Sequence, residues 1–159
     1  MNAEKVLGEL DADAVFEQRR DGYWAAVPSL DVRAMACKML GNSIRFITLT
    51  AMPLTDKSGG YRLLYSWDDD GALINISTTI STGCIQTISD LLPAADWVER
   101  EIRDYYALEF EGRADTLTLM LREGDEPGLF SRTCDLGHET DPAQTARNAV
   151  AADQEGDPQ

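Results

Sequence analysis

The sequence predicts an α+β fold: a two-layer domain in which helices pack on one face of a mostly antiparallel sheet. Three observations predict it. A hairpin signal lies near the N-terminus, three strand-like runs joined by short turns occupy residues 44–80, and segments with helical periodicity stand on either side of those runs. Because antiparallel strands can be joined by very short connections, the central runs are expected to form a meander.

The first elements are a short helix and a hairpin. Residues 3–10 are compatible with the helix. Val15–Arg20 and Tyr23–Val27 then flank Asp21-Gly22. This dipeptide predicts a two-residue hairpin loop, because glycine tolerates positive φ.

A longer helix is expected next. Ser29 follows Pro28 and can cap a helix that runs to Leu40, with Gly41 as its stop. The residues expected to face the core are Leu30, Met35, Met39 and Leu40.

The remaining strands and the connector follow from alternation and turn residues. Ile44–Thr50, Tyr61–Trp67 and Leu73–Ile80 are rich in β-branched and aromatic residues. Residues 82–92 look like a connector, and Thr116–Leu121 is predicted to be a final strand.

The segment from residue 96 to 112 carries the most informative pattern in the chain. Pro93 suits the first turn of a helix here. Glu99 and Arg103 are predicted to lie opposite the apolar sector, four residues apart, where they can pair in water. The apolar sector consists of Ala94, Val98, Ile102, Tyr105 and Tyr106.

Glu101 is the unusual residue of this segment. It is predicted to fall inside the sector spanned by Trp97, Tyr105 and Leu108, with Asp104 at its edge. A carboxylate on a core-facing stripe is costly unless a cation or a hydrogen-bond donor meets it. The pattern alone favours an arginine or a backbone amide of the same chain as that group.

Composition excludes several classes of function. The chain has 159 residues, 43% of them hydrophobic, and a formal net charge of −14 at pH 7. The length suits one domain, or one domain with a tail. The negative charge argues against sequence-independent binding to nucleic acid. The sequence shows neither an apolar run of about 18 residues nor a basic start followed by an apolar region, so we expect a soluble intracellular protein that reaches a membrane only through partners.

Thiol and imidazole chemistry has few candidates. The cysteines are Cys37, Cys84 and Cys134, without a Cys-x-x-Cys spacing, and His138 is the single histidine. This set is too small for a zinc site or an iron–sulfur cluster, and structural free thiols are expected. A catalytic Cys134–His138 pair would lack a group to orient it.

Two acidic groups are weak candidates for chemistry. The run from Asp68 to Gly71 lacks the later glutamate of a calcium loop, so an acidic turn is expected. Glu99, Glu101 and Asp104 could form a general acid–base group, but no nucleophile or cation lies near them in sequence. We therefore expect no catalytic, cofactor-binding or metal-binding residue, and no enzymatic activity of the chain alone.

The block from Leu92 to Tyr106, Leu-Pro-Ala-Ala-Asp-Trp-Val-Glu-Arg-Glu-Ile-Arg-Asp-Tyr-Tyr, closely resembles the signature of the 30-kDa subunit family of complex I (NADH dehydrogenase). The family includes equivalent subunits of energy-converting membrane-bound nickel–iron hydrogenases. Phe110 and Gly112 supply the end of the pattern. The upstream elements come in the same order, so the resemblance covers about residues 23–122.

The chain departs from that family in several places. The family usually has glycine where Ala107 stands. Because alanine disfavours positive φ, the sequence does not establish a positive-φ turn at this position. Arg113-Ala114 replaces a His-Pro pair, and residues 122–134 replace a basic stretch of the respiratory members. The chain is also short. These departures favour the smaller, hydrogenase-type relative.

The resemblance implies a scaffold or docking subunit without a cofactor, in an energy-converting nickel–iron hydrogenase or a complex I-like enzyme. The nickel–iron centre and iron–sulfur clusters are then expected in the partners, a large catalytic subunit and a small iron–sulfur subunit. The implied location is cytoplasmic, peripheral on the inner face of the cytoplasmic membrane. The residues expected at the partner interface are Trp97, Glu99, Arg100, Glu101, Asp104, Tyr105 and Phe110.

This resemblance favours a partner as the group that meets Glu101, since interfacial charges give specificity. Replacing Glu101 or Asp104 by alanine is then expected to weaken assembly without lowering the melting temperature of the isolated domain. A self-sufficient enzyme using the helix carboxylates remains an alternative function.

The domain is expected to span residues 1–122, and residues 123–159 are expected to form an acidic, largely extended or disordered tail. This tail contains too little apolar surface to order itself. Leu129 and Phe130 are exceptions that could pack onto the domain or a partner. A free-standing acidic adaptor that binds through the tail is a further alternative.

Overall fold

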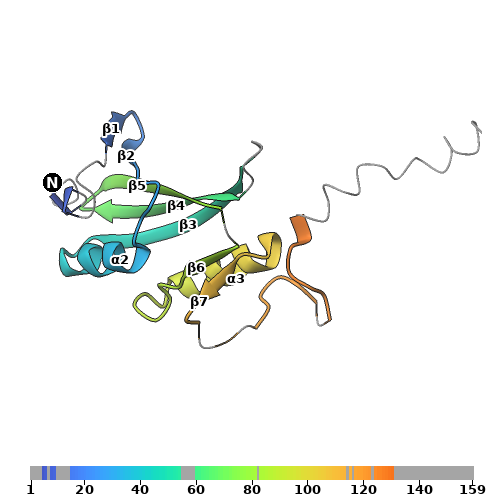
Figure 1. Cartoon of the computed structure of the whole chain (residues 1–159). Coiled ribbons are helices and arrows are strands. Elements are labelled where there is room, and N and C mark those ends of the chain that lie inside the picture. The colour runs from blue at the N-terminus through green and yellow to red at the C-terminus, as the bar shows by residue number, and fades with distance from the viewer. Residues whose placement is uncertain are drawn as a thin grey trace, which may run out of the picture.

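The structure, a computed structural model, describes residues 5–6, 8–9, 15–54, 60–81, 83–113, 115, 117–122 and 124–130. Its larger sheet has the strand order β1-β2-β5-β4-β3, and α2 and α3 lie on one side of it (Figure 1). The β2–β5 pair is parallel and the other pairs are antiparallel. The predicted α+β fold with a mostly antiparallel sheet is therefore confirmed. The elements are β1 (Val15–Arg19), β2 (Gly22–Ala26), α2 (Val32–Gly41), β3 (Arg45–Pro53), β4 (Tyr61–Asp69), β5 (Ala72–Ile80), β6 (Cys84–Gln86), α3 (Ala95–Tyr106) and β7 (Glu109–Glu111).

The core lies between the sheet and the helices. Alternate residues of a strand point to the same side, and in β4 the buried apolar residues are Leu63, Tyr65 and Trp67. Met35 and Met39 of α2 are fully buried in the same core. The opposite face of the sheet carries the other residues of each strand and is not covered by α2 or α3 (Figure 1).

The predicted hairpin is present with its loop shifted by one residue. Gly22 pairs with Arg19, so the loop consists of Arg20 and Asp21. Gly22 has a φ of 135°, and a Cβ there would lie 2.5 Å from the carbonyl oxygen of Leu73. Glycine is therefore required by close approach to β5 as well as by its dihedral angle.

The helix after the hairpin is also present, but its cap is Asp31 and not Ser29. The Asp31 side chain accepts hydrogen bonds from the amides of Arg33 and Ala34, at 3.1 and 2.9 Å. Leu40, expected in the core, is 40% exposed. The buried stripe of α2 consists instead of Val32, Met35, Ala36 and Met39, which are spaced as one helix face.

The region after β5 differs most from the sequence prediction. Part of the expected connector forms β6, which pairs in parallel with β7. The helix expected to reach residue 112 ends at Tyr106. Of the strand expected at 116–121, the described residues 117–121 are not in a strand, because several of their amides bind a side chain of α3 instead.

The chain ends are described in part. Lys5, Val6 and Gly8 are helical, as expected, and Val6 is buried in the core. The amide of Gly128 donates to the carbonyl oxygen of Asp104 at 2.9 Å, which holds the described residues 124–130 near α3. Residues 131–159, including Cys134, His138 and most of the predicted tail, lie outside the described residues.

Candidate functional site

The surface around α3 is the candidate site, because the residues expected to meet a partner lie on this helix or shortly after it. Asp96 lies in the first turn, where a negative charge is favoured by the helix dipole. Ala107, the residue that follows the helix, adopts the left-handed conformation with φ 54° and ψ 30°. The positive-φ turn is therefore present, although the residue is alanine.

Glu99 is buried on the side of α3 that faces the protein, with 1% of its surface exposed. It lies three residues before the buried Ile102, so both belong to one helix face. Its carboxylate accepts hydrogen bonds from the hydroxyl of Thr87 and the amide of Ile88. The prediction that Glu99 faces water and pairs with Arg103 is wrong, because this polar pocket offsets the cost of burying the charge.

Arg113 supplies the positive charge that Glu99 requires. Its side chain is 5% exposed, and its Nη1 and Nη2 atoms lie 3.0 Å from Glu99 Oε2 and 2.6 Å from Asp96 Oδ1. Burial by itself lowers the pKa of Arg113, but the hydrogen bonds to Asp96 and Glu99 outweigh it, so the pKa is raised above its usual value. Burial and, to a smaller extent, the Glu99 charge raise the pKa of Tyr65.

Sequence reasoning missed Arg113 as a site residue. The one signal available was that an arginine replaces the His-Pro pair expected after Gly112. Arg113 lies fourteen residues after Glu99 in sequence, beyond the reach of helical spacing. Only the β7 strand, which returns the chain beside the first turns of α3, brings the two charges together.

Asp104 is completely buried and holds a loop against α3. Its Oδ2 atom accepts hydrogen bonds from the amides of Leu119 and Met120, both at 2.7 Å, and from that of Leu121 at 3.4 Å. Its Oδ1 atom is buried and has no hydrogen-bond partner among the described residues. Asp104 therefore has a structural role within the chain that the sequence did not suggest.

Glu101 is only half-buried, although it was expected inside the core-facing sector, because that side of α3 is occupied by Glu99 and Ile102 instead. No ion pair or hydrogen bond joins its carboxylate to another residue in the part of the chain that the structure describes. It lines a cavity of about 310 Å³ between α3 and the edge strand β3. Other lining residues include Thr48, Thr50, Tyr105 and Phe130.

Phe130 packs against α3, as the sequence allowed. Its ring stacks on Tyr105, with centroids 4.4 Å apart and an interplanar angle of 23°, and meets the ring of Tyr106 edge-on at 5.7 Å. Phe130 nevertheless remains 43% exposed, and the neighbouring Leu129 is 42% exposed. This end of α3 therefore presents aromatic surface that the described residues do not cover.

Trp97 is the most exposed large apolar residue described, at 68%. Leu117 and Met120, on the loop that Asp104 anchors, are 64% and 55% exposed. Trp97, Glu101 and Asp104 follow one another at helical spacings of four and three residues. The anchored loop is thus held on the face of α3 that carries Trp97.

The other predicted interface residues are occupied within the chain. Arg100 pairs with Asp96 and Asp115, each at 3.2 Å, and Phe110 is 4% exposed in the core. Glu99 and Asp104 are buried as described above. Trp97, Glu101 and Tyr105 are therefore the predicted residues that a partner could reach directly.

The remaining candidates have structural explanations. Asp68 lies at the predicted acidic turn, where its Oδ1 accepts a hydrogen bond from the amide of Gly71 at 2.8 Å. Its Oδ2 pairs with Arg45 at 2.9 Å. Cys37 and Cys84 are exposed free thiols. None of the helices in the described residues has the length and apolarity to cross a membrane.

Solved structures show where this fold occurs. A structure described as Nqo5 of a trypsin-resistant fragment (1-134) matches 72% of this chain and 99% of its own, with a TM-score of 0.57 and 21% identity. A chain of the membrane-bound sulfane sulfur reductase, described as an archaeal respiratory membrane complex, matches 89% of this chain and 94% of its own. Its TM-score is 0.67 and its identity 20%. These likenesses show a shared fold.

Sequence comparison gives the family. The C/D 2 subunit of NADH-quinone oxidoreductase from Aquifex aeolicus is 27% identical over 86 residues, which is 52% of this chain and 14% of that protein. The chain thus spans about one seventh of the length of this curated relative. A sequence model of the family described as "Respiratory-chain NADH dehydrogenase, 30 Kd subunit" matches residues 27–129, more than half of the chain. This protein is therefore a member of the 30 Kd subunit family of respiratory-chain NADH dehydrogenase.

Proposed function

We propose that the chain is a non-catalytic docking subunit of a multisubunit, membrane-associated redox complex, and that it binds the large catalytic subunit through the α3 surface. By α3 surface we mean Trp97, Glu101, Tyr105, Met120 and Phe130. Family membership supports a role as a subunit of a respiratory complex. The geometry around α3 supports the choice of surface.

The observation that carries this proposal is the exposure of large apolar side chains on an internally braced support. Trp97 and Met120 would each bury apolar area against a partner, and aromatic residues and methionine are enriched at interfaces. The support is fixed by Glu99–Arg113 and by the bonds of Asp104 to the loop amides. A surface that is ordered before binding loses less conformational entropy on association.

Glu101 adds specificity to this surface. Its half-buried carboxylate lies among apolar and hydroxyl-bearing residues, without a cation among the described residues. A partner arginine or lysine placed over the cavity would pair with Glu101 at the edge of the apolar contact. Such a pair fixes register and disfavours wrong partners.

The parent complex is proposed to be an energy-converting nickel–iron hydrogenase or a complex I-like enzyme. In either case the partners would be a large catalytic subunit and a small iron–sulfur subunit that hold the redox groups. The chain would then lie peripherally on the inner face of the cytoplasmic membrane. A co-purifying large subunit with two Cys-x-x-Cys motifs would identify the hydrogenase, because those thiolates hold nickel and iron.

Co-purification of the intact complex tests the α3 surface. Full-length chain carrying a tag and Trp97→Asp or Met120→Asp is expressed in place of the natural chain, and the partner subunits recovered with it are quantified. We expect recovery to fall at least about ten-fold for Trp97→Asp, since a charge would enter an apolar contact.

Leu40→Asp is the matched control, because Leu40 is a 40% exposed apolar residue on α2. It should leave the recovery of partner subunits unchanged. Thermal unfolding of each variant checks that the fold is intact. Equal recovery with Trp97→Asp, Met120→Asp and the natural chain would show that the α3 surface is not the interface.

A further inference from the structure

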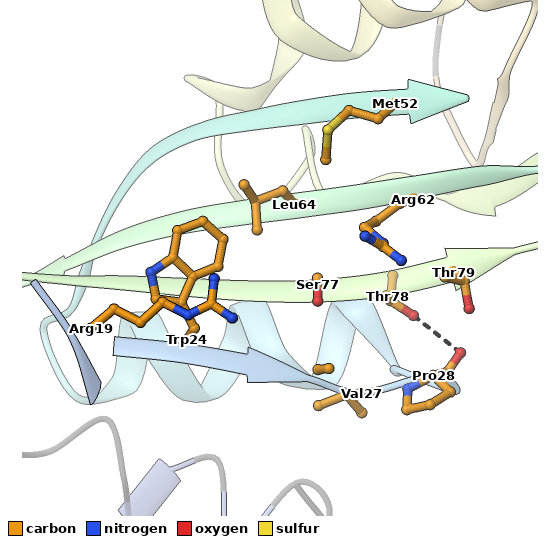
Figure 2. A pocket seen from close by; sticks show the side chains of 11 residues that line it. Arg19, Trp24, Val27, Pro28, Met52, Arg62, Leu64, Ser77, Thr78 and Thr79 are labelled. Carbon is orange, nitrogen blue, oxygen red and sulfur yellow. Dashed lines mark hydrogen bonds between the residues drawn. The ribbon is translucent and has the colours of Figure 1, made fainter. Parts of the chain in front are cut away.

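A second surface lies on the face of the sheet opposite α3. A groove with a cavity volume of about 560 Å³ crosses this face, and its lining comes from β1 to β5. Figure 2 shows Arg19 and Trp24 at one end of the groove, Arg62 at the other, and Leu64 and Ser77 between them. The groove is therefore apolar in its centre with a guanidinium group at each end.

The register of the sheet gives the length of the groove. Trp24 pairs with Asn75 of β5, and Arg62 of β4 pairs with Thr79. Asn75 and Thr79 are four residues apart on one strand, which corresponds to about 13 Å at roughly 3.3 Å per residue. Two groups that meet both ends must be offset by a similar distance along the strands and by about 10 Å across them, because β2 and β4 lie on either side of β5.

Two of the three hydroxyl groups that line the groove, those of Ser77 and Thr78, are already used within the chain. Ser77 and Thr78 donate hydrogen bonds to the carbonyl oxygens of Ala25 and Pro28, both at 3.2 Å (Figure 2 shows the second). The polar groups that remain for recognition are therefore mainly the guanidinium groups.

The two arginines differ in how far they are neutralised. Arg62 has no ion pair with another described residue. Arg19 pairs with the exposed Glu17 at 2.7 Å, and its guanidinium carbon lies 4.8 Å from the ring centroid of Trp24. No described Asp or Glu lines the groove. At the Arg19 end the indole of Trp24 also donates a hydrogen bond to Asp21 at 3.1 Å. In a chain of net charge −14, the local positive charge of this face therefore comes chiefly from Arg62.

We propose that the groove binds an acidic segment of a partner polypeptide that carries carboxylates about four residues apart in extended conformation. An apolar side chain between them would cover Trp24 and Leu64, and the carboxylates would pair with Arg62 and Arg19. Tryptophan and arginine are the residue types that most often dominate interface energy. This inference rests on the proposed role as a subunit, but it assigns a different face and a different partner chemistry.

Site-specific photo-crosslinking in the assembled complex tests the groove. A benzophenone amino acid replaces Met52, which is 40% exposed at the rim, and in a second preparation replaces Thr79. The complex is extracted, irradiated and digested, and the crosslinked peptide is sequenced by mass spectrometry. We expect both positions to capture one segment of a partner subunit with two acidic residues about four positions apart.

Charge reversal supplies the second readout. Arg62→Glu is expected to reduce the crosslink yield at Met52 at least about ten-fold, and salt should reduce the yield of the natural chain, because the contact is electrostatic. Arg20→Glu, in the exposed hairpin loop, makes the same change in net charge and should leave the yield unaltered.

Several results would overturn this inference. Capture of residues 131–159 of the same chain, of a second copy, or of a segment without paired acids would each do so, as would equal yields for Arg62→Glu and Arg20→Glu. Absence of a crosslink while partners still co-purify through the α3 surface would refute the groove alone. If no partner subunit co-purifies with the natural chain, the proposed function itself is refuted.

Discussion

Glu99 and Arg113 form a buried ion pair whose two charges depend on each other. Arg113→Met would leave the Glu99 carboxylate almost fully buried with only its Thr87 and Ile88 donors. Removing one partner of a buried pair costs about 3–5 kcal/mol. We expect a loss of this size in the free energy of unfolding, measured with urea on the full chain.

Two further variants test the cause of that loss. Glu99→Gln in the Arg113→Met background should restore part of the stability, since no unpaired charge is then buried. Arg45→Met breaks an ion pair whose arginine side chain is 74% exposed, and it should cost less than about 1 kcal/mol. Equal losses for Arg45→Met and Arg113→Met would contradict the buried-pair explanation.

Ala107 adopts a backbone conformation that suits glycine better. The left-handed conformation destabilises a folded protein by about 1–2 kcal/mol when the residue is not glycine. Glycine removes this strain, but its more flexible unfolded chain lowers the stability by about 0.5–1 kcal/mol. Ala107→Gly is therefore expected to stabilise the protein by roughly 0.5–1 kcal/mol, seen as a higher midpoint in urea. Ala34→Gly in α2, where φ is helical, should lower the midpoint instead.

The positions of Glu99 and Glu101 show what a helix pattern alone can determine. The sequence predicts that one carboxylate of this helix lies on a core-facing stripe, and one does, but it is Glu99 and not Glu101. Periodicity assigns faces relative to the apolar residues of the helix only. Arg113 and Thr87, which make the burial of Glu99 possible, come from other elements, so the local pattern could not reveal them.

Among the described residues, the hydrogen bonds that join α3 to the loop at 119–121 end on one side chain, that of Asp104. The expectation from sequence is that Asp104→Ala leaves the melting temperature unchanged. The structure leads to the opposite prediction, because Asp104 accepts two amide hydrogen bonds at 2.7 Å. Hydrogen bonds to a charged group contribute about 1.5–3 kcal/mol each, so Asp104→Ala is expected to lower the stability.

Hydrogen exchange measures this contact directly. In Asp104→Ala the amides of Leu119 and Met120 should exchange faster than in the natural chain, and the melting temperature should fall. The amides at the centre of β4, such as Tyr65, should lose protection only by as much as global stability falls. Unchanged exchange at both loop amides would show that Asp104 does not hold the loop in solution.

The segment before α3 is tied to α2 by a charged pair whose strength depends on pH. Arg33 makes paired hydrogen bonds to Asp90, at 2.7 and 2.8 Å, and a third to the carbonyl oxygen of Thr87. The hydrogen bond from Arg33, together with its charge, lowers the pKa of Asp90. The carboxylate therefore contributes stability that is present above its unfolded pKa and is lost as the pH falls through its lower folded pKa.

Asp90→Asn removes this contribution. Its melting temperature should be below that of the natural chain at pH 7, and the difference should shrink as the pH falls below about 4, near the unfolded value for aspartate. Asp70→Asn is the control, because Asp70 is an exposed carboxylate in a turn and Arg33 pairs with Asp90 instead. A difference for Asp90→Asn that stays constant down to a pH of about 2.5, well below the unfolded value, would exclude the pH-dependent pair.

Element prediction from the sequence was most accurate where the pattern is local. The hairpin, α2 and the β3–β5 meander follow from alternation, turn residues and helical spacing, and all are present. The parallel β6–β7 pair joins residues 84–86 to 109–111. Its strands have three residues each, too short for a period to appear, and their pairing depends on α3 lying between them in sequence.

For the molecule as a whole, the two proposed surfaces lie on opposite faces of one sheet. The α3 surface is apolar with one carboxylate, and the groove is apolar with two guanidinium groups. A subunit with two such faces would bridge two partner segments of different chemistry. Trp97 on one face and Arg62 on the other are separated by the packed core, so each face can be altered without touching the other.

Independence of the two faces leads to the last prediction. Substitutions without shared contacts change free energies additively, to within about 0.5 kcal/mol. In a complex reconstituted from purified subunits, the double variant Trp97→Asp, Arg62→Glu should therefore weaken association by the product of the fold-changes of the single variants. The measurement is the dissociation constant from titration at fixed salt.

The salt dependence gives a second test of the two faces. Raising the salt concentration should weaken the association of the natural chain and of Trp97→Asp by similar factors. It should weaken the association of Arg62→Glu less, because that variant has already lost the ionic contact of residue 62. A double variant no weaker than either single one would mean that both residues act on the same contact, and the two-face arrangement would then be wrong.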